Sequence, residues 1–459
     1  MESITNTLRD SKAARWTALG VVAFTMLCGY YLTDVMAPLK PLLEKELLWN
    51  SAEYGFFTSA YGWFNVFLLM LLWGGIILDK MGVRFTGVMA ASIMVIGTAI
   101  KYWAISTHAM DGHVLLGMKE QVVVAGLGFA TFGVGVEVAG ITVSKIIVKW
   151  FKGKEMALAM GLEMATARLG TALAMTTSIP IARALHGVSK PILVCLIMLC
   201  IGLISFIVYT FMDKKLDKSV EAAGLSLSSE EEESFRMKDI LFIVKNRGWW
   251  YIAILCVLFY SAVFPFIKYA TDLMVNKFHV DQELAGIIPG LLPFGTILLT
   301  PFFGNLYDRK GKGATIMIIG AILLIFVHAM YSIPFLNATP IAIFLIIILG
   351  IGFSLVPSAM WPSVPKIIPE KQLGTAYALI FLIQNIGLSL VPLLIGWVLN
   401  KYCITGTRML DGVAVSNYNY TLPMIIFTCF GVLALIFAFL LKAEDKKKGY
   451  GLELPNIKK

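Results

Sequence analysis

Gly75-Ile76-Ile77-Leu78-Asp79-Lys80-Met81-Gly82-Val83-Arg84 is a short signature that occurs again in the second half of the chain, as Gly304-Asn305-Leu306-Tyr307-Asp308-Arg309-Lys310-Gly311-Lys312. In both copies an Asp follows a Gly by four positions, a basic residue follows the Asp, and a second Gly comes three positions after it. Each copy lies in a short polar segment between two long apolar runs. A repeated loop of this kind is typical of a membrane protein with a duplicated unit.

The composition is that of a membrane protein. Hydrophobic residues make up 58% of the chain and charged residues 15%, with a mean hydropathy of +0.79, whereas soluble domains have about 45–50% and about 25%. The formal charge of +9 does not indicate a nucleic-acid partner, because the basic residues flank apolar runs and form no continuous patch.

The six cysteines indicate no metal or disulfide framework. Five lie in apolar runs, and the chain has no CxxC or Cys/His ligand spacing. We therefore expect no metal site. We also expect no cofactor and no catalytic residues. The first apolar run lacks a small-residue cleavage site and reads as a retained spanning helix.

Twelve apolar runs are long enough to cross a bilayer, which needs about 20 residues. They lie near 16–38, 54–78, 85–105, 121–148, 156–185, 190–212, 249–275, 283–306, 313–333, 340–365, 372–400 and 421–441. The predicted fold class is an all-α membrane protein with twelve transmembrane helices in two pseudo-symmetric six-helix bundles.

Lys and Arg residues predict the orientation. With the N-terminus in the cytoplasm, 26 of the 38 fall on the cytoplasmic side, 8 on the opposite side and 4 within the runs. Both termini are therefore predicted to be cytoplasmic.

Four segments follow from this pattern. The boundaries are 1–212 for the first bundle, 213–247 for a cytoplasmic linker, 248–441 for the second bundle and 442–459 for a cytoplasmic tail. The linker contains the acidic stretch Ser226–Glu233 and is expected to be mobile or loosely helical. The two signatures are 229 residues apart (304 minus 75), which agrees with duplication of a six-helix unit.

The repeated signature resembles the loop motif of the major facilitator superfamily. The resemblance implies that Asp79 with Arg84, and Asp308 with Arg309, form cytoplasmic contacts that favour an outward-open state. The alternative is a generic solvated turn.

Other stretches resemble the lysosomal dipeptide-transporter branch of this superfamily, most specifically in the fourth, fifth, seventh and eleventh predicted helices. They are Lys149–Glu155, Gly161–Gly170, Ala262–Ile267, Met360–Pro362 and Gln372–Tyr377 with Gln384–Asn385. The resemblance is weakest in the tails, the linker and the outer loops.

Two charged residues are predicted near the middle of the membrane. Glu137 lies about 24 Å from the outer end of the fourth run, and Arg168 lies about 18 Å from the cytoplasmic end of the fifth. A central charge costs about 2.5–3.5 kcal/mol, so such residues pair or face water. A carboxylate and a guanidinium at one depth suit a zwitterion, and the resemblance implies that the matching residues hold the termini of a peptide. The alternative is a mutual ion pair that supports packing.

Other charges are predicted nearer the membrane faces. Asp34 and Lys268 lie near the outer face, and a contact between them would close that side. The alternatives are that each reaches outer water, or that Lys268 pairs with Asp272. Lys145 and Glu163, where the resembled family has uncharged residues, are expected to form a gate or to reach cytoplasmic water.

Tyr30, Tyr260, Trp361 and Gln384 are further candidates for the substrate-binding surface, for which ordinary helix packing or an interfacial aromatic belt is the alternative.

The favoured function is transport of small zwitterionic solutes, most of all dipeptides, by alternating access. The resembled family implies a uniporter. We expect a monomer, with a small-molecule substrate and the lipid bilayer as partners. One alternative is a proton-coupled carrier of another organic anion, in which Asp34 and Glu137 titrate.

A non-transporting receptor or scaffold is the remote alternative, because the linker and tail are too short for an output domain. No enzyme motif such as HExxH or GxSxG occurs. We expect a bacterial inner membrane as the location, with a lysosomal membrane as the alternative.

Overall fold

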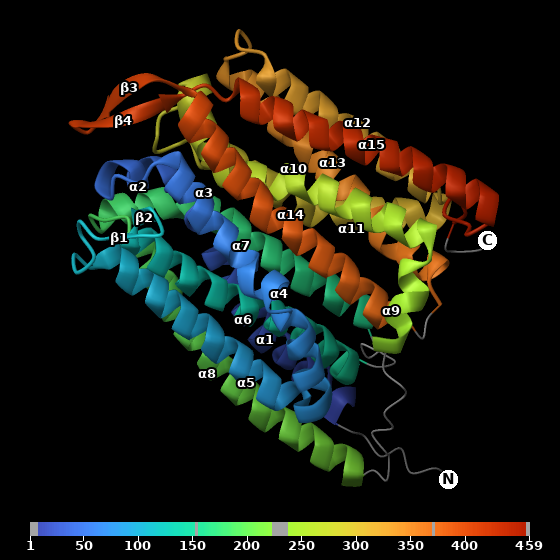
Figure 1. Ribbon diagram of the computed structural model, residues 1–459. Coiled ribbons are helices and arrows are strands. Elements are labelled where there is room, and N and C mark those ends of the chain that lie inside the picture. The colour runs from blue at the N-terminus through green and yellow to red at the C-terminus, as the bar shows by residue number, and fades with distance from the viewer. Residues whose placement is uncertain (1–7, 152–154, 223–236, 370–371, 456–459) are drawn as a thin grey trace.

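The computed structural model describes residues 8–151, 155–222, 237–369 and 372–455. The long helices lie alongside one another and form a bundle with two opposite ends (Figure 1). One end carries the antiparallel pair β3 (Ile404–Leu410) and β4 (Val413–Tyr418), and we call it the hairpin end. The start of α1 (Lys12–Asp34) and the end of α15 (Thr421–Lys448) lie toward the opposite end, which we call the terminal end.

The first half of the chain, through residue 222, contains the long helices α1 (Lys12–Asp34), α5 (Met70–Ser106), α6 (Glu120–Phe151), α7 (Met156–Ala184) and α8 (Lys190–Ala222). Shorter elements join them. They are η1 (Leu8–Asp10), α2 (Lys40–Glu46), α3 (Ser51–Ser59), η2 (Ala60–Gly62), α4 (Trp63–Phe67), β1 (Val114–Leu115) and β2 (Met118–Lys119).

The second half begins with the short helix α9 (Met237–Val244). Its long helices are α10 (Arg247–Phe278), α11 (Ile287–Lys310), α12 (Gly313–Ser332), α13 (Thr339–Ile367), α14 (Leu373–Tyr402) and α15 (Thr421–Lys448). The predicted linker 213–247 therefore includes the end of α8 and all of α9, while its acidic stretch lies outside the described residues.

Within the described ranges, ten helices are long and apolar enough to cross a membrane. Twelve runs were predicted, and the difference has two sources. Helix α5 covers parts of two predicted runs and is broken at Gly82, where φ is 76° and ψ is 172°. Helix α7 is 29 residues long but is not among the ten, and it includes Glu163, Arg168 and Arg183.

Small residues bring α5 and α6 into backbone contact. A Cβ added to Gly97 would lie 2.4 Å from the backbone nitrogen of Phe132, and one added to Gly128 would lie 2.6 Å from that of Lys101. Only glycine allows so close an approach, which is a common device of helix packing in membranes. The glycine-rich sequence of α6 is thus explained by packing.

Helix α8 presents a stripe of exposed apolar side chains. Ile197, Ile201, Ile204, Val208 and Phe211 recur at three- and four-residue spacing, and all are at least 46% exposed. An apolar stripe of this length faces lipid more readily than water. The outer surface of the bundle therefore fits a bilayer.

The segment after α15 packs over the second copy of the signature. The backbone N–H groups of Lys312 and Gly313 donate to the carbonyls of Glu453 and Leu452, each at 2.9 Å. The carboxylate of Glu453 accepts from the backbone N–H of Thr315 at 2.9 Å and from its hydroxyl at 2.8 Å. These bonds satisfy N–H groups that the first turn of α12 leaves without helical partners.

Candidate functional site

Glu137 lies near the middle of α6 and is half-buried. Its Oε1 atom accepts a hydrogen bond of 2.7 Å from the hydroxyl of Tyr61 in η2. Among the described residues, no cation lies within ion-pair distance of this carboxylate. A partly accessible carboxylate with one neutral donor keeps acceptor capacity for a ligand.

Arg168 lies near the middle of α7 and is also half-buried. Its guanidinium lies over two rings of the second half, 5.0 Å from the centroid of Phe353 and 5.7 Å from that of Phe264. Stacking on aromatic faces is a favoured setting for arginine. The guanidinium thus packs on aromatic rings. In the part of the chain that the structure describes, it has no carboxylate partner.

Tyr30 lies on α1, the helix that packs against those of both charged residues. Tyr30 is half-buried in α1, where a Cβ added to Gly29 would lie 3.0 Å from Val136, next to Glu137, and one added to Gly170 on the helix of Arg168 would lie 3.1 Å from the backbone nitrogen of Tyr31. The structure therefore brings these three predicted residues, from α6, α7 and α1, into one region.

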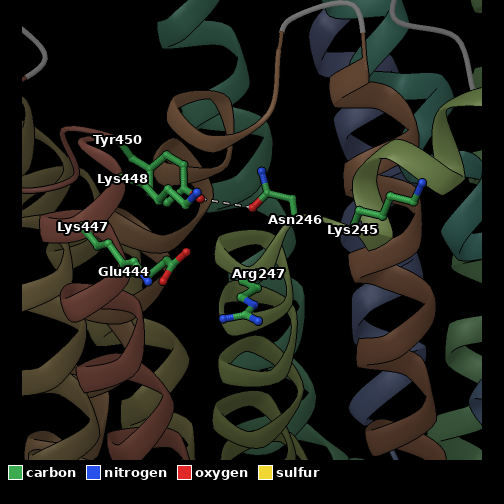
Figure 2. A pocket seen from close by; sticks show the side chains of 7 residues that line it. All are labelled: Lys245, Asn246, Arg247, Glu444, Lys447, Lys448 and Tyr450. Atoms are coloured by element: carbon green, nitrogen blue, oxygen red, sulfur yellow. Dashed lines mark hydrogen bonds between the residues drawn. The ribbon is translucent and has the colours of Figure 1, made fainter.

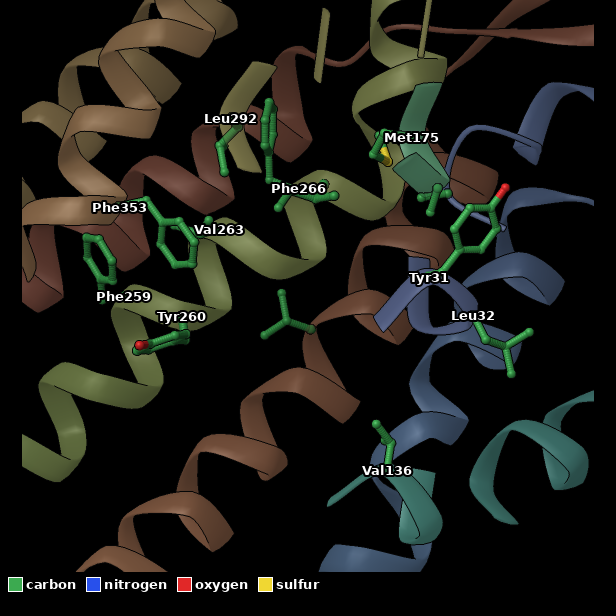
Figure 3. Packing of buried hydrophobic residues seen from close by; sticks show 14 of the residues in the cluster. Tyr31, Leu32, Val136, Met175, Phe259, Tyr260, Val263, Phe266, Leu292 and Phe353 are labelled. Atoms are coloured by element: carbon green, nitrogen blue, oxygen red, sulfur yellow. The ribbon is translucent and has the colours of Figure 1, made fainter. Parts of the chain in front are cut away.

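The other predicted residues line the second half of this region. Tyr260 of α10 has ring centroids of Phe353 at 5.9 Å and Trp361 at 6.4 Å, and Figure 3 shows its side chain with Phe259 and Phe353. The indole N–H of Trp361 donates to the Tyr260 hydroxyl at 3.1 Å. Gln384 of α14 accepts from the thiol of Cys256, one helical turn from Tyr260, at 3.5 Å.

At the hairpin end, the structure brings Asp34 and Lys268 together. The ammonium of Lys268 on α10 lies 2.6 Å from Oδ1 of Asp34 at the end of α1, and 2.6 Å from the carbonyl of Thr33. The pair joins the two halves of the chain. Asp272, the other predicted partner for Lys268, is engaged elsewhere.

Asp272 pairs with Lys40 of α2, whose ammonium lies 2.8 Å from Oδ2 of Asp272 and 2.7 Å from Oε1 of Glu44. The side chains of Lys40 and Asp272 are 0% exposed. The hydroxyl of Tyr420 also donates to Asp272. Burial by itself lowers the pKa of Lys40, but the carboxylates of Asp272 and Glu44 outweigh it and raise the pKa above its ordinary value. This buried cluster is a second connection between the halves.

Two exposed ion pairs also join the halves at the hairpin end. Lys45 of α2 reaches Asp411 in the β3–β4 turn at 2.8 Å, and Arg183 of α7 reaches Glu283 at 3.4 Å. The hydrogen bond from Lys45 lowers the pKa of the Asp411 carboxyl. The hairpin thus reaches from the second half of the chain onto α2 of the first.

At the terminal end, the first signature makes ion pairs within its own half. Asp79 pairs with Lys145 of α6 at 3.1 Å, and Arg84 pairs with Asp217 of α8 at 2.8 Å. Lys149 of α6 joins the same cluster through Asp213 at 2.7 Å. Asp79 and Arg84 therefore contact different helices.

The second signature is arranged differently. Asp308 and Arg309 lie in the last turn of α11, where Arg309 is exposed. Gly311 has φ of 69° and is covered by the tail, since an added Cβ would lie 2.5 Å from the carbonyl of Glu453.

Several residues near these clusters were missed from the sequence. Tyr61, Phe264 and Phe353 read as ordinary aromatics of apolar runs, although Phe264 shares a helix face with Tyr260 four residues earlier. Lys40 lay in an apparent loop. Lys101 of α5 was also missed, although a lysine within an apolar run is a visible signal. Its ammonium lies 4.5 Å from the ring centroid of Phe129 and 5.1 Å from that of Phe57.

A bundle of long apolar helices, with partly exposed charges at its middle and ion pairs between its halves, is the architecture of a membrane transporter. The chain belongs to the Major Facilitator Superfamily, whose sequence profile matches residues 20–392.

The chain is similar to the lysosomal dipeptide transporter MFSD1 of Mus musculus, with 28% identity over 399 residues that cover 85% of this chain and 81% of the relative. It is 26% identical to the protein of the same name from Homo sapiens over 408 residues, covering 85% and 81%. These relatives support a transporter similar to MFSD1.

Solved structures agree on the fold. A bacterial homologue of the human lysosomal transporter Spinster, inward-facing and unoccupied, matches with a TM-score of 0.71 and 14% identity, covering 95% of this chain and 98% of that one. The nucleoside transporter NupG matches with a TM-score of 0.63 and 15% identity, covering 93% and 98%.

Proposed function

We propose that the protein transports small zwitterionic solutes by alternating access, with dipeptides as the first candidates. The similarity to MFSD1 over most of both chains supports this substrate class. The observation that carries the proposal is the arrangement of Glu137 and Arg168. Both are half-buried in the middle of helices that pack on α1, and they form no ion pair with each other within the described ranges.

The chemistry of the two side chains fits the two ends of a dipeptide. Glu137 would accept hydrogen bonds from the ligand ammonium, with Tyr61 orienting the carboxylate. Arg168 would donate two parallel hydrogen bonds to the ligand carboxylate, a geometry that its planar fork favours. Tyr30, Tyr260, Trp361 and Gln384 would surround the ligand side chains.

In this proposal the chain crosses the membrane twelve times, with α5 crossing on both sides of the Gly82 break and α7 as a further span. The two bundles are residues 1–212 and 248–441. The terminal end faces the cytoplasm, as the distribution of Lys and Arg indicates. A bacterial inner membrane is the proposed location.

The gates follow from the ion pairs. Asp34–Lys268 would hold the hairpin end closed in the present state and separate when that end opens. Asp79 with Arg84, and Asp308 with Arg309, would bias the opposite end. Each pair then favours one direction of opening, as alternating access requires.

The test uses protein reconstituted in vesicles, dipeptide uptake and dipeptide-induced thermal stabilisation. We expect wild type to take up dipeptides, and Glu137→Gln and Arg168→Ala each to lose most uptake. Uptake measured with and without a pH gradient separates a uniporter from a proton-coupled carrier.

Chemically blocked dipeptides provide the matched control. An N-acetylated dipeptide lacks the ammonium, and a dipeptide amide lacks the carboxylate. Wild type should reject both, whereas Glu137→Gln should lose its preference for the free amine and Arg168→Ala its preference for the free acid. If dipeptides neither bind nor enter, and both variants behave as wild type, the proposal fails.

A further inference from the structure

A cavity of about 300 Å³ lies at the terminal end, between the start of α10 and the end of α15 (Figure 2). The residues that line it are Lys245, Asn246, Arg247, Glu444, Lys447, Lys448 and Tyr450. None of them belongs to the central region or to the repeated signatures. The cavity is therefore distinct from the proposed substrate site and from the signature ion pairs.

The charge of the cavity is strongly positive. Four lining residues are basic, and only Glu444 is acidic. Within the described part of the chain, none of the four cations takes part in an ion pair or a side-chain hydrogen bond. Four cations beside one carboxylate leave a net positive charge, which raises the local potential and attracts an anion.

Hydrogen bonds and ring packing hold two residues of the cavity wall, Asn246 and Tyr450, in place. Asn246 caps α10 by accepting from the backbone N–H of Trp249 at 3.2 Å, and the Tyr450 hydroxyl donates to Asn246 at 3.4 Å. The Tyr450 ring packs on Gly248, where an added Cβ would lie 2.9 Å from the ring. The start of α10 has a positive partial charge and the end of α15 a negative one, so the attraction for an anion rests on the cationic side chains.

Neighbouring apolar side chains indicate the depth of the cavity in a membrane. Leu241 and Phe242 of α9 are 69% and 50% exposed, and Trp250 of α10 is 38% exposed. The indole N–H of Trp250 donates to the carbonyl of Val244 at 2.8 Å, which ties α9 to α10. Tryptophan and short amphipathic helices are typical of the layer where headgroups meet acyl chains.

We propose that this cavity binds the phosphate headgroup of an anionic phospholipid. Arg247, Lys447 and Lys448 would contact the phosphate, and the acyl chains would pass along the exposed apolar side chains of α9 and α10. Basic pockets between helices at a membrane face are suited to such headgroups. Bound lipid would tie the start of α10 to the end of α15.

The test compares two variants of equal charge. The cavity variant is Arg247→Gln/Lys447→Gln/Lys448→Gln. The control is Lys214→Gln/Lys215→Gln/Lys218→Gln, which removes three basic residues from α8 at the same end. Purified full-length protein is titrated with phosphatidylglycerol, phosphatidylcholine or inorganic phosphate, and bound lipid is counted by native mass spectrometry alongside thermal unfolding.

We expect phosphatidylglycerol to bind and stabilise wild type and the control variant. The cavity variant should bind it about tenfold more weakly or worse, because each basic side chain at the membrane surface contributes to anionic-lipid binding. Glu444→Gln should bind it more tightly than wild type, a gain that misfolding cannot mimic.

Three results would overturn the proposal. The first is equal loss in both triple variants, which indicates diffuse surface charge. The second is equal binding of phosphatidylcholine. The third is stabilisation by inorganic phosphate as strong as that by the lipid, which indicates a site for a soluble anion.

Discussion

The two ends of the bundle are stabilised in different ways. At the hairpin end, four ion pairs join the two halves of the chain, and the Lys40–Asp272 pair among them is fully buried. Among the described residues at the terminal end, the first signature pairs Asp79 with Lys145 and Arg84 with Asp217 within one half, and these pairs are more exposed, with Arg84 at 40%. Buried pairs are costly to break, and exposed pairs contribute little. Within the described ranges, the hairpin end therefore has the more strongly buried ion pair between the halves.

The largest test of this difference is Lys40→Met. Among the described residues, removal of the ammonium leaves the buried Asp272 with only a long cationic contact of 4.0 Å to Arg408, and breaking a buried pair costs about 3–5 kcal/mol. Thermal unfolding in detergent should show the loss, and Lys40→Met/Asp272→Leu should recover much of it. Lys101→Met is the matched control, because Lys101 is equally buried but faces aromatic rings. It should be neutral or stabilising, and equal losses for the two lysines would contradict the comparison.

Asp34→Asn is expected to have the next largest effect. It removes a charge-assisted hydrogen bond to Lys268, worth about 1.5–3 kcal/mol, and so favours separation of the hairpin end. Distances between spin labels placed on α1 and α10 at that end should lengthen. The exchange Asp34→Lys/Lys268→Asp should restore the wild-type distance, and a persistent opening would show that the ion pair is not the cause.

Asp79→Asn should affect stability less, by about 1 kcal/mol or below, because its pair with Lys145 is partly exposed. Dipeptide uptake should slow while the preference among dipeptides stays the same. Lys145→Gln removes the other partner and should give the same phenotype. A changed substrate preference in either variant would argue for a role in binding.

The smallest effect is expected at the Lys45–Asp411 pair. Its carboxyl has a lowered pKa, so the contribution of the pair is present above the ordinary value of 3.8 and is lost as the pH falls through the lowered value. Lys45→Ala should change the unfolding free energy by less than about 1 kcal/mol, with the difference shrinking in high salt. A large effect at neutral pH would mean that the hairpin contributes more to closure than its exposure suggests.

The sequence predicted the class of fold and the charged residues of the central region because both depend on composition within single helices. A charge in a long apolar run stands out, and Glu137 and Arg168 did so. Their neighbours depend on which helix faces meet. The rings of Phe264 and Phe353 under Arg168 therefore required the three-dimensional arrangement, as did the pairing of Lys40 with a residue 232 positions away.

The hairpin is a different case, because its signal was present in the sequence. Asp411-Gly412 stands between two short runs, and both residues have positive φ, 47° and 85°. Asp-Gly is a favoured dipeptide for a two-residue hairpin turn. The segment lies between two long apolar runs and is short and polar, so the twelve-run pattern does not by itself distinguish this hairpin from a loop.

The contact between the C-terminal segment and α12 has a practical consequence for protein engineering. A truncation placed directly after α15 would remove only residues beyond the last long helix, which makes it an attractive choice. It would also delete Leu452 and Glu453, whose carbonyls and carboxylate bind the first N–H groups of α12. Affinity tags and fluorescent fusions should therefore be attached after residue 455, so that the last helix of the chain and the ninth predicted span remain joined.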